Sequence, residues 1–328
     1  MLNIVKNRNI FFIFSGVLLL VSLFAVITFG LKPGIDFTGG SLMEISFTSE
    51  RPDLESMQAQ FADGTYGSVL VQPTGENAYI LKMRFISEDE HQEILANLRS
   101  EFENIMVDVM IDPEAVKDPN FVAVEDKFDA EKPENRLIEE RLEVIGSSVS
   151  SQMKSRTFEA GIAVVIAIVL YITYAFRKVS KPIHSWKYGV TAVVALIHDV
   201  FITMGVFAFL GKYMGVEVDI PFVVALLTIL GYSVNDTIIV FDRIRENLIK
   251  YGYDDFENIV NKGVNETISR SINTSFTTLL VLIALFFFGG STIHYFVLAL
   301  IIGISFGTYS SIFIASPLLV FWQKISKK

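Results

Sequence analysis

The chain has 328 residues, of which 51% are hydrophobic, carries a net charge of −9 and contains no cysteine. The high apolar fraction excludes a disordered chain, and the lack of cysteine excludes a disulfide scaffold, a thiolate metal site and a cysteine nucleophile. The acidic balance argues against a nucleic-acid partner. Residues 31–157 hold 12 Lys and Arg against 25 Asp and Glu, whereas the rest hold 15 against 11. The acidity therefore belongs to one segment.

Six apolar stretches are long enough to cross a membrane, which takes about 20 mostly apolar residues. They are residues 10–31, 158–176, 188–210, 219–241, 268–289 and 295–321. The first stretch follows Lys6 and Arg8 as in a signal peptide, but its apolar run is longer and no small-residue cleavage site follows. We interpret it as an uncleaved anchor. The sequence thus predicts an α-helical integral membrane protein with six transmembrane helices.

The loops between these stretches predict their orientation, because Lys and Arg concentrate in short cytoplasmic loops. Lys and Arg gather at the N-terminus, after the second span, after the fourth span and at the C-terminus. We therefore expect both termini in the cytoplasm and the acidic segment outside. The expected domains are 1–32 with the first helix, 33–156 as the outer domain, and 157–328 with helices 2–6 and the cytoplasmic C-terminus.

The outer segment has the pattern of a folded α+β domain. Alternating residues predict strands at 41–48, 68–73, 78–85 and 105–111, and helices at 52–61 and 87–103. Ser87 and Glu90 form the capping-box pattern of a helix start. This β-α-β-β-α-β order is the ferredoxin-like motif. Asp112–Glu140 is predicted to be an irregular surface excursion, and Leu142–Ile145 an additional edge strand.

Charged residues within membrane spans are costly and are therefore candidates for function. Asp236 lies in the inner part of the fourth span and Arg270 near the inner end of the fifth. Because these two spans run antiparallel, the carboxylate and the guanidinium fall at similar depth and can neutralise each other. We predict proton transfer at this pair; the alternative is a static structural ion pair.

The fifth span supports a site for proton transfer, because its continuous apolar run covers only 279–288. It cannot cross unless the polar turns before that run also enter the membrane, where they must face protein or a wet cavity. We predict a hydrated half-channel that reaches Asp236 from the cytoplasm. The supporting polar residues are predicted to be His198, Asp199, Asn235, Asn273, Thr274 and Thr277. For His198 and Asp199, a helix-packing hydrogen bond is the alternative.

The sixth span has small residues at every fourth position, namely Gly303, Gly307, Ser311 and Ala315. This stripe predicts helix–helix packing rather than a site. The chain has no Gly-rich phosphate loop, no G-x-S-x-G elbow and no metal-ligand spacing among its four histidines. We therefore expect no enzymatic activity, no cofactor and no resident metal.

The motifs of the chain resemble those of a known family. Gly34, Asp36, Phe37, Gly39 and Gly40 form a G-x-D-F-x-G-G pattern after the first span. Residues 195–200, 231–247 and 269–278 also match the family's membrane motifs. The chain is thereby similar to the SecD/SecF family of the bacterial protein-export apparatus, in its SecF form, within the resistance-nodulation-division superfamily.

The resemblance implies a function that spacing alone does not. A SecF-type subunit pairs with SecD in a twelve-helix unit of the bacterial inner (plasma) membrane, with its outer domain in the periplasm. Together they use the proton-motive force to assist translocation of secreted polypeptides through SecYEG, after SecA has pushed them in. YajC and other accessory membrane subunits are further expected partners. The proton path would run through an Asp of SecD and the residues that match Asp236 and Arg270 here, with Na⁺ as the alternative coupling ion.

Two other functions fit parts of the pattern. A small-molecule efflux subunit of the same superfamily is one, although the outer domain is small for a drug-binding porter. A passive assembly factor of the translocon is the other. A passive scaffold has no need of Asp236 or of a polar fifth span.

Overall fold

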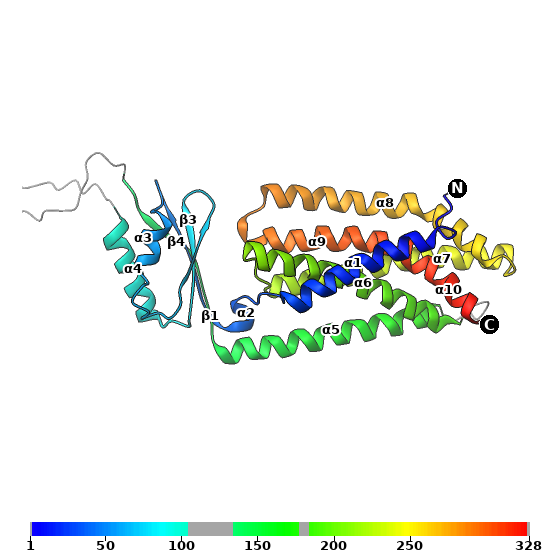
Figure 1. Ribbon diagram of the computed structural model, residues 1–328, viewed down its shortest axis with the longest axis horizontal. Helices are drawn as coiled ribbons and strands as arrows, with labels where there is room; N and C mark the ends of the chain where they lie inside the picture. Colours follow the sequence, from blue (N-terminus) through cyan, green and yellow to red (C-terminus); the bar gives the residue numbers. More distant parts are fainter. Residues whose placement is uncertain (1, 104–133, 177–183, 327–328) are drawn as a thin grey trace, which may run out of the picture. The chain divides into compact units, whose positions relative to one another are not determined.

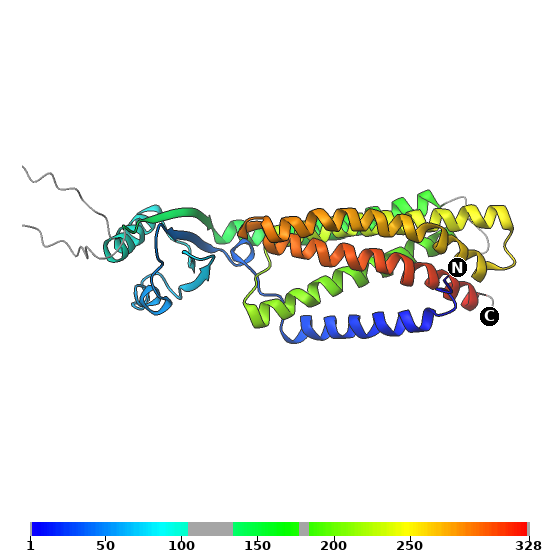
Figure 2. The same cartoon turned by 90° about the horizontal axis from the view of Figure 1, so that it is seen from above.

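The computed structural model describes residues 2–103, 134–176 and 184–326, in two compact units (Figure 1 and Figure 2). The first, the membrane unit, consists of 1–34 and 153–328; the second consists of 35–152 and is called the outer unit after its predicted location.

Six helices in the described residues are long and apolar enough to cross a membrane, which confirms the predicted number. They are α1 (Arg8–Thr28), α5 (Ser147–Ala175), α6 (Ser185–Met214), α7 (Ile220–Tyr251), α8 (Phe256–Phe288) and α9 (Ser291–Ser310), the last continued by the π-helical turn η2 (Ser311–Ala315) and by α10 (Ser316–Ser326). Several helices extend beyond the predicted apolar stretches. For example, α8 begins at Phe256, whereas the fifth apolar stretch begins at residue 268. Apolar length follows the hydrocarbon thickness, whereas helical hydrogen bonding continues into the polar region.

Glycines bring α9 and α7 close together. A Cβ on Gly303 would overlap the Ile229 side chain, and a Cβ on Gly307 would lie 2.9 Å from the Cβ of Ser233. Any larger residue at these positions would force the facing side chain or the helix itself to shift. The predicted role of the small-residue stripe in helix packing is therefore confirmed at these two glycines.

At the end of the bundle where both termini lie, polar contacts join three helices (Figure 1). Glu257 on α8 accepts from Arg8 of α1 at 2.7 Å and from Lys324 of α10 at 2.8 Å. The amides of Asn261 and Asn265 bind the backbone of Leu2 at 2.7–3.0 Å. The first residues of the chain are thus anchored to α8.

The outer unit contains a four-stranded antiparallel sheet with strand order β2-β3-β1-β4. Its elements are α2 (Ile35–Thr38), β1 (Gly40–Phe47), α3 (Leu54–Ala59), β2 (Leu70–Thr74), β3 (Ala78–Met83), α4 (Glu88–Phe102) and β4 (Leu137–Ile145). Residues from the sheet and from both α3 and α4 share one buried core, which includes Met43, Leu81, Met57 and Leu98.

The last strand differs from the expectation. Residues 137–140 were expected to be irregular, but β4 begins at Leu137 and pairs with β1 as far as Ile145. Its glutamates obscured the alternation in the sequence. In the structure these glutamates have polar partners: Ser46 of β1 donates to Glu140 at 2.6 Å, and Glu139 lies 3.0 Å from the His91 ring of α4. The predicted strand at 105–111 lies outside the described residues.

Helix α4 begins with the predicted capping box. The Ser87 side chain accepts from the backbone N–H of Glu90 at 3.3 Å, and Glu90 accepts from the backbone N–H of Ser87 at 2.8 Å. The Arg84 guanidinium also donates to Glu90, at 2.5 Å. The hydrogen bonds that the Glu90 carboxylate accepts, first from Arg84 and then from the Ser87 backbone, lower its pKa from 4.5 to about 2.

Glu90→Gln is expected to loosen the start of α4 in a pH-dependent way. The pKa is lowered by folding, so the stabilisation is present above pH 4.5 and is lost as the pH falls toward 2. Hydrogen exchange of α4 peptides at matched pH should be faster in the variant above pH 4.5, and the difference should shrink on acidification. Glu93→Gln, on the same helix beyond the cap, is the control. An equal difference at all pH values contradicts the assigned role.

Candidate functional site

Asp236 is a buried carboxylate held between three helical segments of the membrane unit. It lies on α7 with only 5% of its surface exposed. One carboxylate oxygen, Oδ1, accepts from the hydroxyl of Ser271 on α8 at 2.5 Å. The other, Oδ2, accepts from the hydroxyl of Ser311, the first residue of η2, also at 2.5 Å. Two hydroxyls therefore compensate for the loss of water around this carboxylate.

Asp199 is a second buried carboxylate, on α6, and has no exposed surface. Its Oδ1 lies 3.0 Å from Nδ1 of the preceding residue, His198. Its Oδ2 accepts from Ser233 of α7 at 2.6 Å and from Ser310 of α9 at 2.8 Å. Asp199 thus joins α6, α7 and α9.

The two carboxylates meet at the junction of α9 and η2. Consecutive serines, Ser310 and Ser311, donate to Asp199 and Asp236 respectively. A π-helical turn interrupts the regular α-helical ladder here, and such turns are frequent at functional sites. The hydroxyl of Ser316 donates to the carbonyl of Ser311, five residues earlier, at 3.0 Å. We call the group the carboxylate cluster: His198, Asp199, Ser233, Asp236, Ser271, Ser310 and Ser311.

The predicted neutralisation of Asp236 by Arg270 does not occur within this chain. Ser271, not Arg270, points at Asp236, because consecutive residues on a helix project about 100° apart. Arg270 is exposed, and among the described residues its guanidinium has neither an ion pair nor a hydrogen bond. A static ion pair between these two side chains is equally absent from the described part of the chain.

Some of the other predicted supporting residues lie in the carboxylate cluster, and the rest lie on the exposed surface of the helices. His198 and Asp199 belong to the carboxylate cluster. Asn235, Asn273, Thr274 and Thr277 are exposed. The two threonine hydroxyls bind carbonyls of their own helix, at 2.9 Å.

Helix α8 presents three different faces. Ser271, Ser275 and Leu282 are buried in the bundle. A second, exposed side carries polar residues three or four positions apart along the helix. We call it the polar face of α8; it consists of Arg270, Asn273, Thr274 and Thr277. Ile272, Phe276, Leu280 and Ile283 form an exposed apolar face. Only the apolar face is suited to contact with lipid.

Of the four hydroxyls that bind the two carboxylates, the sequence indicated Ser271, as part of the polar turns of the fifth span, but not Ser233, Ser310 or Ser311. Ser233 lies one helical turn before Asp236 but binds Asp199 of α6, so this spacing does not indicate its partner. Ser310 and Ser311 are a polar pair within an apolar run, and Ser311 was interpreted only as a packing residue. The pairing of hydroxyls with carboxylates depends on how each helix is rotated about its axis relative to its neighbours, which the sequence alone does not give.

The predicted glycine motif has a conformational role in the structure. Gly39 and Gly40 have φ of 75° and 132°, in the region that favours glycine. A Cβ on Gly40 would lie 2.6 Å from the carbonyl oxygen of Met83 on β3. Gly34 donates its backbone N–H to the carbonyl of Val218 at 2.8 Å, and Phe37 is buried. Asp36 lies in the short helix α2. The two adjacent glycines thus let the chain turn into β1 beside β3.

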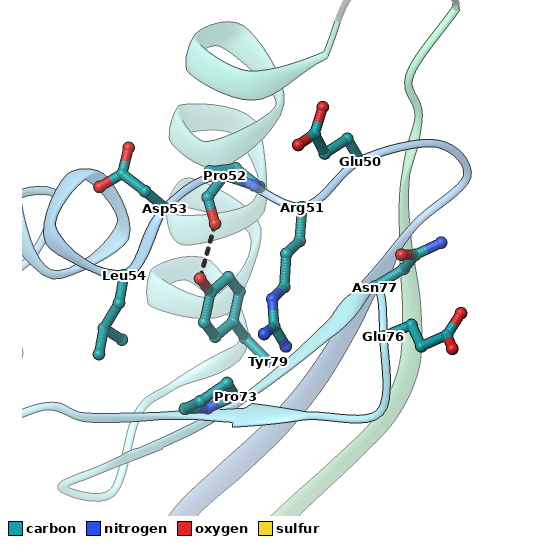
Figure 3. Close-up of a pocket in the computed structure, with 9 residues that line it drawn as sticks. All are labelled: Glu50, Arg51, Pro52, Asp53, Leu54, Pro73, Glu76, Asn77 and Tyr79. Atoms are coloured by element: carbon teal, nitrogen blue, oxygen red, sulfur yellow. Dashed lines mark hydrogen bonds between the residues drawn. The ribbon is translucent and has the colours of Figure 1, made fainter.

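The outer unit has a hollow of about 380 Å³ beside the loop that precedes α3 (Figure 3). Its lining residues are Glu50, Arg51, Pro52, Asp53, Leu54, Pro73, Glu76, Asn77 and Tyr79. Tyr79 donates to the carbonyl of Pro52 at 2.6 Å, and the Arg51 guanidinium lies 5.4 Å from the centre of the Tyr79 ring. Burial raises the pKa of the Tyr79 hydroxyl. Both side chains at the base of the hollow therefore hold the fold together.

Comparison with known proteins gives matches along nearly the whole chain. Residues 124–325 match the family "Protein export membrane protein SecD/SecF, C-terminal", and residues 24–50 match the "SecD/SecF GG Motif". The chain is 39% identical over 336 residues to the protein translocase subunit SecF of Thermobaculum terrenum, covering 98% of this chain and 94% of the relative. It is 34% identical over 310 residues to that of Haemophilus influenzae, covering 94% and 82%.

Solved structures give the same result. The crystal structure of SecDF from Thermus thermophilus, a translocon-associated membrane protein, matches with a TM-score of 0.77 at 28% identity. A SecDF structure in a super-membrane-facing form matches with a TM-score of 0.62 at 26% identity. The chain is covered over 98% and 100% of its length, but it spans only 39% of each of these longer chains.

Proposed function

The chain belongs to the SecD/SecF family of protein-export membrane proteins, and from this we propose that it is the SecF-type subunit of a proton-driven accessory unit of protein translocation. Its partner in this proposal is SecD, and the unit acts on secreted polypeptides at SecYEG after SecA, with YajC as an accessory subunit. The observation that carries the proposal is the buried Asp236 carboxylate with its two hydroxyl partners.

The surroundings of Asp236 suit reversible protonation. As a carboxylate, Asp236 accepts from Ser311; as a neutral acid, it must instead donate one hydrogen bond. The Ser311 hydroxyl has a second acceptor, the carbonyl of Thr308, at 3.0 Å. It can turn to that carbonyl and accept from the protonated acid. Both protonation states are thereby satisfied without an unpaired buried group.

The polar face of α8 supports SecD as the partner. An arginine in contact with hydrocarbon costs about 2.5–3.5 kcal/mol on insertion scales. Arg270 and its neighbours therefore require a protein cover that offers hydrogen-bond acceptors and an acidic group. In the proposed complex, an Asp of SecD pairs with Arg270, so the proton path crosses the subunit boundary.

The proposed orientation places both termini in the cytoplasm and residues 35–152 in the periplasm of a bacterial inner membrane. The positive loops support it. The order β-α-β-β-α-β with sheet order β2-β3-β1-β4 supports a ferredoxin-like periplasmic domain, with β4 as its last strand. The proposed coupling ion is H⁺, because hydroxyls that can reverse their hydrogen bonds suit a proton.

Single cysteines on α8 are expected to distinguish its two exposed faces. The chain has no cysteine, so Asn273→Cys and Phe276→Cys each give one thiol. In membranes that contain SecD, we expect Asn273→Cys to cross-link to SecD when its thiol carries a photo-activated cross-linker, and its free thiol to resist a lipid-soluble maleimide. Phe276→Cys, on the apolar face, is the control and should be modified.

Equal modification of both thiols in the presence of SecD would contradict the assigned interface.

Co-purification tests the export role itself. Recovery with SecD and SecYEG supports it, whereas recovery with an outer-membrane tunnel protein would favour small-molecule efflux.

A further inference from the structure

His198 carries an unpaired polar atom in the middle of the membrane unit. The residue is 5% exposed, and its Nδ1 is engaged with Asp199. Its Nε2 is buried and, in the part of the chain that the structure describes, has no hydrogen-bond partner. A buried ring nitrogen without a partner is unfavourable unless it binds a proton or a water molecule.

The charge of the carboxylate cluster depends on protons. It holds two carboxylates, and His198 is its sole member able to carry a positive charge. The other titratable group beside His198 is Tyr309 of α9, whose ring lies 6.3 Å away and whose hydroxyl binds Ser15 of α1 at 3.1 Å. Lys187 lies in the first turn of α6 against Trp186 and Trp322 of α10, three helical turns from His198. The net charge of the cluster therefore depends on proton uptake at Asp236, at Asp199 and at His198.

Ser310, like Ser311, has two possible hydrogen-bond acceptors, a carboxylate and a backbone carbonyl of its own helix. Its hydroxyl lies 2.8 Å from Asp199 and 3.1 Å from the carbonyl of Gly307. When His198 becomes an imidazolium, its Nδ1 draws the Asp199 carboxylate more strongly, and Ser310 can turn to that carbonyl. Because Ser310 and Ser311 are consecutive residues at the π-helical turn, a shift of this turn toward one carboxylate changes the distance of the neighbouring hydroxyl from the other.

We propose that Asp199 and His198 form a second protonation site, coupled to Asp236 through Ser310 and Ser311 at the π-helical turn. Uptake of H⁺ at Nε2 converts the imidazole into an imidazolium paired with the Asp199 carboxylate, and release restores the neutral ring. The inference rests on the proposed function in so far as Asp236 is the coupling group.

Nitrogen NMR of the His198 ring tests the proposal in the complex with SecD in lipid. The chain is labelled with ¹⁵N-histidine and carries His91→Gln, His184→Gln and His294→Gln, so that a single ring reports. We expect the ring to change between its neutral and its protonated form within the measured range of pH 5 to 9. Asp236→Asn should move the midpoint to lower pH, because it removes a negative charge. Adding Ser310→Ala should reduce that displacement by more than half.

Ser305→Ala is the matched control, because its hydroxyl on α9 binds, among the described residues, only a carbonyl of its own helix, that of Ile301 at 2.7 Å. A ring that keeps one protonation state from pH 5 to 9 overturns the proposal. So does a midpoint unmoved by Asp236→Asn, or a Ser310→Ala effect no larger than that of Ser305→Ala. Export by Asp236→Asn is measured separately: parent-like export with a displaced midpoint would refute the proposed function but leave the second site standing.

Discussion

Asp236→Asn is expected to abolish the acceleration of export by a proton gradient, while the protein still folds and assembles with SecD. Asparagine keeps the size of the side chain and can still bind the hydroxyls of Ser271 and Ser311, but it cannot bind and release a proton. One charge that crosses 100 mV supplies about 2.3 kcal/mol, which biases a two-state motion about fifty-fold. The expected loss is therefore of the order of tens-fold in gradient-driven export by reconstituted vesicles.

Asp242→Asn is the matched control for this substitution. Asp242 lies on the same helix, and its half-exposed carboxylate pairs with Arg245 at 2.7 Å. Surface pairs of this kind contribute little. We expect export close to that of the parent; a similar loss in both variants would show that any change of charge on α7 is damaging, and Asp236 would lose its assigned role.

Gly307→Leu is expected to separate α9 from α7 and to disable the site without touching a carboxylate. Even a Cβ at this position would lie 2.9 Å from the Cβ of Ser233. Overpacking of this kind costs about 1–3 kcal/mol, and it would move Ser310 and Ser311 away from their carboxylates. Thermal unfolding in detergent should begin at lower temperature, and export should fall with it.

Gly161→Leu on α5 is the control, because nothing lies within 4 Å of a Cβ there. It should leave the unfolding temperature nearly unchanged. If Gly307→Leu were as stable and as active as this control, the close approach of α7 and α9 could not be what positions the serines.

The transmembrane architecture was predictable because hydrocarbon imposes a length and a composition on each helix. The same argument found Asp236, since a carboxylate in such a stretch is conspicuous. Helix ends were not predictable in this way. Helix α7 continues to Tyr251, ten residues past its apolar stretch, because a helix outside the hydrocarbon does not need apolar side chains.

The partners of Asp236 were not predictable because they depend on helix phase. Arg270 and Ser271 are neighbours in sequence, yet the serine enters the bundle and the arginine lies on the exposed side of α8. Charge complementarity predicts the arginine as the partner of Asp236. The packing of α8 on α7 instead places the serine beside the carboxylate. The serines that bind Asp199 were missed for a related reason, since they come from two other helices and no spacing along the chain connects them.

The central claim is that protons bound at Asp236 drive export. It is tested most directly by the export rate of vesicles that contain the full complex, measured across a range of pH gradients and Na⁺ concentrations, for the parent and for Asp236→Asn. We predict that the parent responds to the proton gradient and not to Na⁺, and that the variant responds to neither. A variant whose rate follows the proton gradient as the parent's does would contradict the claim.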